Sequence, residues 1–378
     1  MKKTWCCLGL ISLIFSEKLP QKVVVCGVCK NVADRLPYSI KIMENIGNLF
    51  SDYRIIVYEN NSTDQTPKLL QAWNMQNSKV LTISEQLTPE ECKRIFVNPD
   101  WGNKNHDFFK PEPIARARNI VKDIAMSEQY KQFEYLIWID MDFMIEPAYK
   151  GFIEIFTSNK EWDAIFAYSS HPNGQFYDWY AFRDHKYPLG PELLGNYWWD
   201  FKKTITLNMK DEWYPVYSAF GGCGIYKKSS IQGCQYSGVV TKDVENFYKQ
   251  IFLNEPLSNQ FIQKYFDYIK NLKKTVEVDK PSFSLPDIDD VETGIIIKNF
   301  SKDIIWRIDR AVRKYPAVCE HVALHATMIA NGHDKLFINP RLLFHYSGPA
   351  NQKKTPPKLP KNAYWKSSQE RAPIKNLY

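Results

Sequence analysis

KVVVCGVC, residues 22–29, is the first of three short apolar stretches that decide the fold. It is continuous and rich in β-branched residues, as expected of a strand that is buried on both faces of a parallel sheet. YRIIVYEN (53–60) and SKVLTIS (78–84) have the same character, and a stretch with helical features precedes each of them. This β-α-β-α-β order predicts an α/β fold with a mostly parallel open sheet, right-handed crossovers and flanking helices.

The rest of the chain continues the alternation of strands and helices. Further strands are predicted at 133–140, 162–170, 219–228 and 335–346. Helices are predicted at 35–50, 66–76, 114–128, 244–275 and 320–332, the last closed by Gly332, and surface loops at 85–113 and 281–293.

Charge and composition limit the class of partner. The chain has 49 basic and 42 acidic residues, a net charge of +7 that is spread along the sequence, and 44% apolar residues. The apolar share excludes a wholly disordered chain. A mild, dispersed excess of charge suits a small anionic substrate or an anionic membrane surface as well as it suits nucleic acid. No nucleic-acid partner is predicted for the chain.

The two ends of the chain differ from its middle. MKKTWCCLGLISLIF has two lysines followed by an apolar run, so residues 1–20 are predicted to be a signal peptide or a short signal anchor. This predicts an exported or membrane-anchored protein of the secretory pathway or cell envelope. If the segment is instead the first strand or helix of the fold, the protein is cytoplasmic. Residues 351–378 are predicted to be a basic, Pro-rich, extended tail.

The eight cysteines do not form the pattern of a disulfide framework in a chain of 378 residues. Cys26 and Cys29 lie within a predicted strand and are interpreted as core thiols. A bridge between Cys223 and Cys234 is an open alternative if the protein is exported.

Two acidic residues end an apolar strand in YLIWIDMDF, residues 135–143. A carboxylate in a buried strand costs several kcal/mol unless it is paired or bound to a metal. At the end of the strand, both Asp140 and Asp142 can reach one cation, and hard oxygen ligands select Mg²⁺ or Mn²⁺. The alternative is an acidic turn in solvent. Lys30, Asn31 and residues 59–64 also follow strands, so we expect them along the same crevice.

These residues resemble the glycosyltransferases of the GT-A fold, whose DxD motif holds a divalent metal on the diphosphate of a nucleotide-sugar. The resemblance covers residues 22–347 and includes VYENNSTDQT (57–66) and ARARN (115–119). Among narrower groups, the chain is most similar to the fungal capsule-type α-mannosyltransferases, which have a comparable YENxSTDxT. The resemblance implies a catalytic domain over residues 21–350, with a nucleotide-sugar-binding half (21–145) and an acceptor-binding half (146–350).

The resemblance also implies residues that bind the donor. Glu59 would contact the base or ribose, and its alternative is a loop carboxylate with backbone partners. Asp64 lies near the same pocket, two residues before a helix-capping Thr66, which favours a structural role. Arg118 would contact phosphate, and Asp140 would bind both the nucleotide-sugar and the metal.

Gly221 and Gly222 would line the donor-sugar or acceptor pocket, where glycine permits a close approach of the backbone, although a β-bulge needs glycine equally. Trp179 and Tyr180 are candidates for stacking on an acceptor sugar. His345 would be a third metal ligand, with a structural histidine as the alternative.

Glu320 would be the catalytic base toward the acceptor hydroxyl in an inverting enzyme, with His321 replacing a second acid. The alternative for Glu320 is stabilisation of the helix dipole. If the enzyme is retaining, as the mannosyltransferase likeness implies, Glu320 has another role.

The sequence therefore predicts an enzyme that transfers a sugar from a nucleotide-sugar donor to a hydroxyl of a glycan, glycolipid or glycoprotein acceptor, with Mn²⁺ or Mg²⁺ as cofactor and membrane association through the N-terminus. Two alternatives remain open. One is a non-catalytic carbohydrate-binding protein on the same scaffold, and the other is a metal-dependent nucleotidyltransferase or phosphohydrolase.

Overall fold

A computed structural model describes residues 18–96, 111–170, 176–194, 206–270, 275–278, 294–297, 304–307 and 316–345. The predicted loop at 281–293 and the Pro-rich tail at 351–378 lie outside the described residues. The predicted signal segment lies outside them up to residue 17, whereas residues 19 and 20 already belong to the first strand. The described part of the chain contains no helix with the length and apolar character needed to span a bilayer.

The centre of the protein is an eight-stranded sheet in the order β3-β2-β1-β4-β7-β5-β11-β6. Its first half consists of parallel strands, β1 (Leu19–Cys29), β2 (Phe50–Asn60), β3 (Val80–Glu85) and β4 (Tyr135–Ile139). These are the strands that the sequence predicts, and the α/β class with a mostly parallel sheet is confirmed.

The second half of the sheet contains reversed strands. β7 (Cys223–Lys227) lies between β4 and β5 (Ala164–Ser170) and is antiparallel to both. β11 (Leu336–His345) runs parallel to β5, and the two-residue β6 (Tyr214–Pro215) is antiparallel to β11 at the edge. The reversal of β7 brings the residues before it to the carboxyl ends of β4 and β5.

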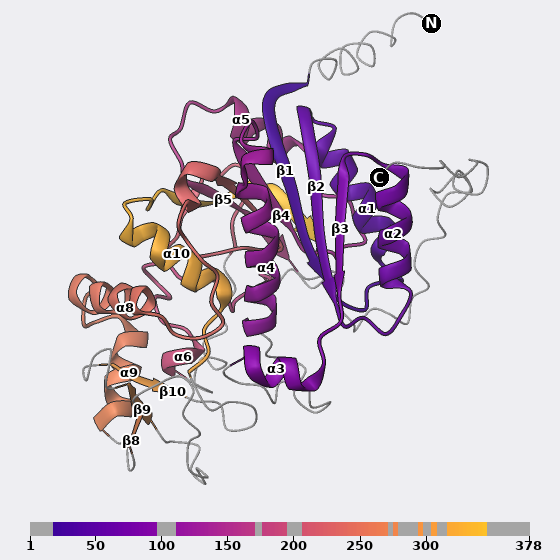
Figure 1. Cartoon of the computed structure of the whole chain (residues 1–378). Helices are drawn as coiled ribbons and strands as arrows, with labels where there is room; N and C mark the ends of the chain where they lie inside the picture. Colours follow the sequence, from indigo (N-terminus) through magenta and orange to yellow (C-terminus); the bar gives the residue numbers. More distant parts are fainter. Residues whose placement is uncertain are drawn as a thin grey trace, which may run out of the picture.

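Helices cover both faces of the sheet (Figure 1). α1 (Leu36–Gly47), α2 (Thr66–Gln76) and α5 (Lys150–Thr157) pack on one face, and α4 (Pro111–Met126) and α10 (Glu320–Ala330) on the other. Successive side chains of each strand alternate between these two cores, so Val24 packs toward α4 and Val25 toward α1. Gly332, with φ +84°, follows α10 as predicted.

Two predicted elements differ from the structure. The predicted loop at 85–113 contains α3 (Pro89–Ile95), which Thr88 and Glu91 cap reciprocally, and α4 begins at Pro111. The predicted helix at 244–275 is two helices, α8 (Lys242–Asn254) and α9 (Gln260–Lys270). Pro256 lies between them and cannot continue the hydrogen bonds of a helix.

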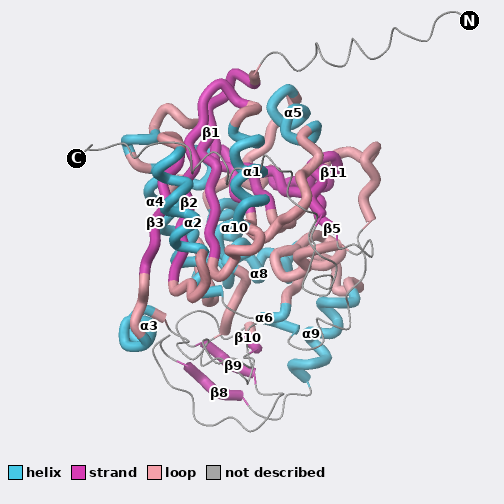
Figure 2. The backbone as a smooth tube through the Cα atoms, turned by 90° about the vertical axis from the view of Figure 1, so that its right-hand side faces the viewer, coloured by secondary structure: helices cyan, strands magenta, loops and turns pink. Residues whose placement is uncertain are grey.

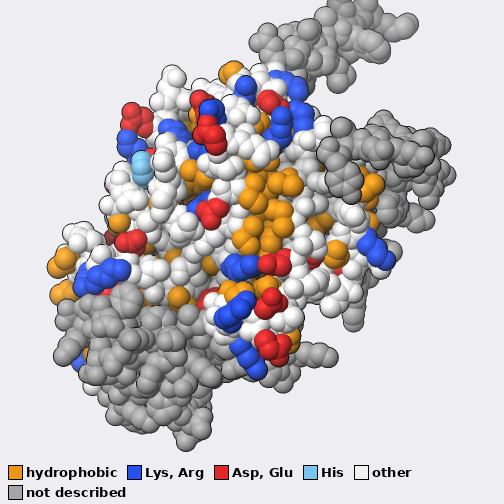
Figure 3. Space-filling view, viewed as in Figure 1, with side chains coloured by type: hydrophobic (Ala, Val, Ile, Leu, Met, Phe, Trp, Pro, Cys, Tyr) orange, Lys and Arg blue, Asp and Glu red, His pale blue; other side chains and the backbone are white. Residues whose placement is uncertain are grey.

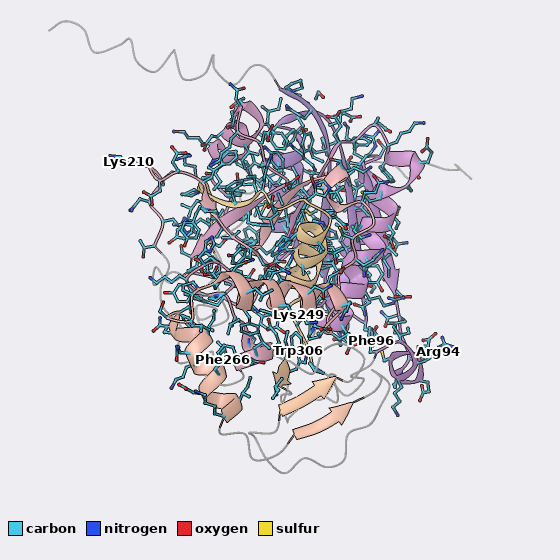
Figure 4. The ribbon with its side chains drawn as sticks, turned by 90° about the vertical axis from the view of Figure 1, so that its left-hand side faces the viewer. Arg94, Phe96, Lys210, Lys249, Phe266 and Trp306 are labelled. Carbon is cyan, nitrogen blue, oxygen red and sulfur yellow. The ribbon has the colours of Figure 1, made fainter. Side chains whose placement is uncertain are left out.

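A small three-stranded sheet lies at one end of the molecule, near α6 (Pro191–Leu194) and α9 (Figure 2). Its strands are β8 (Thr275–Val278), β9 (Gly294–Ile297) and β10 (Ile305–Arg307). Trp306 of β10, labelled in Figure 4, is fully buried. It packs against Tyr248 of α8 with ring centroids 5.9 Å apart. This aromatic contact attaches the small sheet to the helices beside the main sheet.

Charged side chains of both signs are mixed on the surface, as the sequence predicts. On the face seen in Figure 3, basic and acidic side chains are interspersed. The six described cysteines are free thiols, so Cys223 and Cys234 do not form the bridge that export would allow. Cys26 is buried in the core as predicted, whereas Cys29 is half-buried at the end of β1.

Candidate functional site

A cleft of about 700 Å³ opens at the carboxyl ends of β1, β2 and β4, beside α4 and the start of α10. Its polar lining comes from Lys30, Asn31, Asn60, Arg118, Asp140, Asp142, Tyr177, Asp178, Tyr180, Glu320 and His321. Open α/β sheets bind ligands at this edge because strand ends and loops converge there. Eight residues that the sequence places at the site therefore lie in one cleft: Lys30, Asn31, Asn60, Arg118, Asp140, Asp142, Tyr180 and Glu320.

The two aspartates follow β4 directly. The backbone N–H of Asp140 donates to the carbonyl of Gly222, 2.9 Å away, which extends the pairing of β4 with β7 by one residue. The Asp140 carboxylate accepts from Nη2 of Arg118 at 3.2 Å and is 24% exposed. Burial raises the pKa of Asp140, and Arg118 opposes the rise. Asp142 lies 3.6 Å from Nη1 of Arg35 and is 26% exposed, so each carboxylate faces a guanidinium and the cleft.

Arg118 is the central cation of the cleft. Its side chain is 4% exposed, and its Nε donates to Oε1 of Glu320 at 3.2 Å. Its guanidinium lies over the rings of Phe220 and Trp138, with the carbon 4.6 Å and 5.2 Å from their centroids. Burial acts to lower the pKa of Arg118, but the carboxylates of Glu320 and Asp140 outweigh it, so the side chain stays charged. A guanidinium fork that bonds two carboxylates fixes both of them.

Glu320 is the first residue of α10, where the positive end of the helix dipole favours a carboxylate. Its side chain is 8% exposed. Burial raises the pKa of Glu320, and Arg118 opposes this effect. The side chain lines the cleft, so both interpretations of Glu320, helix stabilisation and proton transfer, agree with its position.

The two aspartates offer the oxygen ligands that Mg²⁺ and Mn²⁺ prefer, and both open into the same cleft. His345 does not line the cleft, and its Nδ1 lies 3.4 Å from Oγ of Ser170 on the neighbouring β5. β11 is three strand positions from β4, although Phe344, next to His345, packs against Phe143, next to Asp142, with ring centroids 5.1 Å apart. Within the described ranges, no three His, Cys, Asp or Glu side chains are grouped to hold a metal. The predicted third ligand is therefore not brought to the aspartates.

Glu59 and Asp64 lie outside the lining of the cleft. Glu59 is fully buried, and it accepts from the backbone N–H of Ser62 at 3.3 Å and from the hydroxyl of Ser84. These are the partners expected of a loop carboxylate.

Asp64 has a similar place in the loop after β2. It accepts from the N–H groups of Thr66 at 2.9 Å and Ala33 at 3.1 Å. Burial acts to raise the pKa of Asp64, but its hydrogen bonds with Thr66 and Ala33 hold the pKa below the usual range. Asp64 thereby ties the loop after β1 to the loop after β2, and both loops border the cleft.

Gly221 and Gly222 adopt φ angles of +63° and +76°, which disfavour other residues. A Cβ on Gly222 would lie 2.3 Å from the ring of Phe143, and the N–H of Gly221 donates to Oδ2 of Asp178 at 3.0 Å. The two glycines do not line the cleft. They position two aspartates that do, because Gly222 accepts from the N–H of Asp140 and Gly221 donates to Asp178.

The two aromatic residues predicted to stack on an acceptor sugar, Trp179 and Tyr180, lie in different surroundings. Tyr180 lines the cleft, whereas Trp179 packs edge-on against Phe176 and Tyr187, each with centroids 5.7 Å away. Trp179 therefore belongs to an aromatic cluster beside the cleft.

Sequence reasoning did not single out Asp178 of the cleft or Arg35 beside it, and it mentioned His321 only as the replacement of a second acid. Arg35 faces Asp142 from the turn before α1, and His321 lies on Phe220 at the start of α10. Asp178 has a φ of +71°, unusual for a residue other than glycine. Burial, with Asp140 and Glu320 nearby, raises the pKa of Asp178 to about 7, although the N–H of Gly221 opposes this. The signal for Asp178 in the sequence is only an acid among the aromatics of FYDWY.

No protein-family model matches the chain, and no curated protein matches it. Among solved structures, 155 chains match. TarS from S. aureus in complex with UDP-GlcNAc has 14% identity and a TM-score of 0.33 over 57% of this chain and 48% of its own. The mannosyltransferase PcManGT from Pyrobaculum calidifontis, in complex with GDP-Man and Mn²⁺, has 10% identity and a TM-score of 0.31 over 57% of this chain and 46% of its own.

Glucosyl-3-phosphoglycerate synthase from Mycobacterium tuberculosis, in complex with Mn²⁺, UDP and phosphoglyceric acid, has 14% identity and a TM-score of 0.31. That match covers 62% of this chain and 64% of the synthase. The chain spans about half the length of the first solved structures that it matches, with 50%, 48% and 46% of those chains covered. Values of this size describe a partial similarity, so a function has to be inferred from the cleft itself.

Proposed function

We propose that the protein is a GT-A-type glycosyltransferase that transfers a sugar from a nucleotide-sugar donor to a hydroxyl of a glycan, glycolipid or protein acceptor. The observation that carries the proposal is the position of Asp140 and Asp142. They end a buried strand, open into a cleft of about 700 Å³, and share it with the buried cation Arg118. Carboxylates so placed suit a divalent metal and a diphosphate, and the cleft is large enough for a small ligand.

Asp140 and Asp142 would hold Mn²⁺ or Mg²⁺, which when bound supplies positive charge for the departing diphosphate. Arg118 keeps Asp140 in position, because its fork bonds that carboxylate and Glu320 together. Lys30 and Asn31, after β1, line the same cleft and would contact the phosphates or ribose. Tyr180 lines the cleft and would offer its ring to an acceptor sugar.

Glu320 would accept the proton of the acceptor hydroxyl in an inverting reaction. Its buried carboxylate has a raised pKa, so it is more basic than an exposed glutamate would be. In a retaining reaction, Glu320 would instead orient the substrate through Arg118. The likeness of YENNSTDQT to the fungal capsule-type α-mannosyltransferases favours a hexose donor and the retaining outcome as the narrower proposal, with the N-terminal segment as a signal or anchor.

The test is a panel of nucleotide-sugars with and without Mn²⁺, followed by turnover of the donor that binds. A ligand that binds only the folded state raises the melting temperature. At a ligand concentration 100 times its dissociation constant, the folded state is stabilised by about 2.7 kcal/mol. We expect one donor to raise it more with Mn²⁺ than without, and to release a nucleoside diphosphate in the presence of an acceptor.

Asp142→Asn should lower kcat/KM by about 10² or more, because the amide binds the metal poorly while its shape is kept. Asp123→Asn is the matched control, because Asp123 lies on the exposed side of α4 with its side chain 60% exposed. Its activity should equal that of the wild type. Full activity of Asp142→Asn would contradict the proposal. Release of orthophosphate without an acceptor would indicate a phosphohydrolase, and sugar binding without turnover a non-catalytic protein.

A further inference from the structure

His321 has buried ring nitrogens that nothing in the described part of the chain uses. The residue is 2% exposed, lines the cleft, and stacks on Phe220 with ring centroids 3.9 Å apart at 19°. Its Nε2 lies 3.5 Å from Oε1 of Glu320, yet neither ring nitrogen makes a hydrogen bond to a described residue. A buried polar group without a partner lowers stability, so its presence in a cleft wall needs a reason.

Arg118 has the same property on the same wall. Its Nε and Nη2 are bonded to Glu320 and Asp140, but its buried Nη1 has no hydrogen-bond partner among the described residues. The Arg118 guanidinium and the His321 ring both pack against Phe220. Two unused polar groups from α4 and α10 therefore meet at one place in the cleft.

The charges of this wall indicate a neutral partner. The single positive charge of Arg118 is already shared by the carboxylates of Asp140 and Glu320, so Nη1 adds little attraction for a further anion. Burial, with help from Arg118 and His325, lowers the pKa of His321 well below its usual value, so the ring is neutral. A neutral imidazole has one donor and one acceptor, and a hydroxyl can pair with either of them.

We propose that His321 and Nη1 of Arg118 form a subsite that binds one hydroxyl of a substrate sugar and sets specificity at that position. The inference rests on the proposed transfer of a sugar. The hydroxyl accepts from Nη1 and exchanges a hydrogen bond with the imidazole, so it satisfies groups that the protein alone leaves unused. The hydroxyl belongs either to the transferred sugar or to the acceptor, and both have the same chemistry.

His325, one turn later on α10, provides the matched control. It is fully buried, does not line the cleft, and uses both ring nitrogens, with Oγ of Ser218 at 2.8 Å and the hydroxyl of Tyr226 at 3.0 Å. The two histidines therefore differ mainly in whether their nitrogens are satisfied inside the protein.

The first measurement is the melting temperature of the ligand-free protein. His321→Phe keeps a ring on Phe220 and removes unused polar atoms, so we expect an unchanged or higher melting temperature. His325→Phe leaves Ser218 and Tyr226 without their partner, so we expect a lower one. A fall for His321→Phe equal to that for His325→Phe would overturn the proposal, because it would show that the His321 nitrogens are already satisfied.

The second measurement compares positional deoxy analogues of the donor and of the acceptor. A site built to bond a hydroxyl rejects the analogue that lacks it, so for the wild type we expect one position to lose about 10²-fold or more in kcat/KM. In His321→Phe the loss at that position should shrink to about tenfold or less, while the losses at other positions stay the same. His321→Asn, which keeps a donor and an acceptor, should retain more of the discrimination than His321→Phe.

Donor analogues and acceptor analogues are assayed separately. The deoxy position whose penalty shrinks in His321→Phe therefore shows whether the hydroxyl belongs to the donor or to the acceptor. Turnover in which every deoxy penalty is the same in the wild type and in His321→Phe overturns the subsite and leaves the glycosyltransferase intact. Absence of turnover with every donor overturns the proposed function, and the subsite with it.

Discussion

Asp178 links the stability of the protein to pH. Its pKa is raised to about 7, first by burial and then by the nearby charge of Asp140, whereas a carboxyl in an unfolded chain titrates near 3.9. Between these values the folded state binds a proton that the unfolded state has released. The contribution of Asp178 to stability is therefore fully present below the unfolded pKa and is lost as the pH rises toward 7.

We expect Asp178→Asn to remove this dependence. Asparagine cannot ionise, tolerates the positive φ of this position, and keeps an oxygen that accepts from the N–H of Gly221. Urea unfolding of both proteins at several pH values between roughly 4 and 8 gives the difference in their free energies of unfolding. The free energy of unfolding of the variant should rise relative to that of the wild type as the pH rises, with no further increase above about pH 7. A difference that does not change with pH would contradict the expectation.

The sequence predicts which strand ends supply the cleft. It does not predict which of two consecutive side chains at a strand end, such as Glu59 and Asn60, faces the cleft. Tyr58 and Trp138 pack on the α4 side of the sheet, so Asn60 and Asp140, two residues later, reach the cleft on that side. Glu59 points to the opposite side, where it is buried. Both faces of these strands are apolar, so the sequence contains no sign of which face the cleft adjoins.

The segment that leads into β7 leaves no room for a side chain at Gly222. Gly222 has a φ of +76°, and an added Cβ would lie 2.3 Å from the ring of Phe143. Its carbonyl also accepts from the N–H of Asp140. A side chain here would push on the residues that hold the cleft aspartates.

Gly222→Ala and Gly233→Ala form a matched pair. Gly233 has the same φ of +76°, but an added Cβ meets nothing within 4 Å. Both variants should lose about 1–2 kcal/mol for the backbone conformation, and Gly222→Ala about 1–3 kcal/mol more from overpacking. Chemical denaturation measures this difference, and donor binding should weaken in Gly222→Ala alone. Equal losses in the two variants would show that Phe143 moves aside freely.

Elements that depend on local sequence were predicted better than those that depend on distant contacts. The three parallel strands, α1 and α10 follow from apolar patterns and caps. The direction of β7 depends on pairing with β4 and β5, and no local signal encodes it. The break between α8 and α9 did have a local signal, Pro256, which the amphipathic pattern on both sides obscured.

At the scale of the whole molecule, thiols do not stabilise the described fold through bridges. We expect Cys26, Cys29, Cys92, Cys223, Cys234 and Cys319 all to be alkylated after unfolding without a reductant, as peptide mass spectrometry would show. In the folded protein, Cys26, Cys223 and Cys319 should react slowly, because burial raises the pKa of each thiol. Recovery of a Cys223–Cys234 peptide pair that resists alkylation until reduced would contradict the expectation.

The site could be predicted as a location but not as a complete set of ligands. β7 and β5 lie between β4 and β11, and His345 neither lines the cleft nor groups with the two aspartates among the described residues. Where β7 and β5 insert is a property of the assembled sheet. The same insertion brings Asp178 and Phe220 into the cleft, although neither lies near the DxD motif in the sequence.

The reversal of β7 has a consequence for how related proteins can diverge. Because this strand runs against its neighbours, the chain reaches the cleft before entering β7, through residues 216–222, and leaves at the opposite edge. Natural variants can therefore change the part of this approach that precedes Gly221 and Gly222 without changing the register of the central strands. Under the proposed function, such changes would alter the choice of substrate while Asp140 and Asp142 keep their positions, so homologues with different sugar preferences should differ most in this approach.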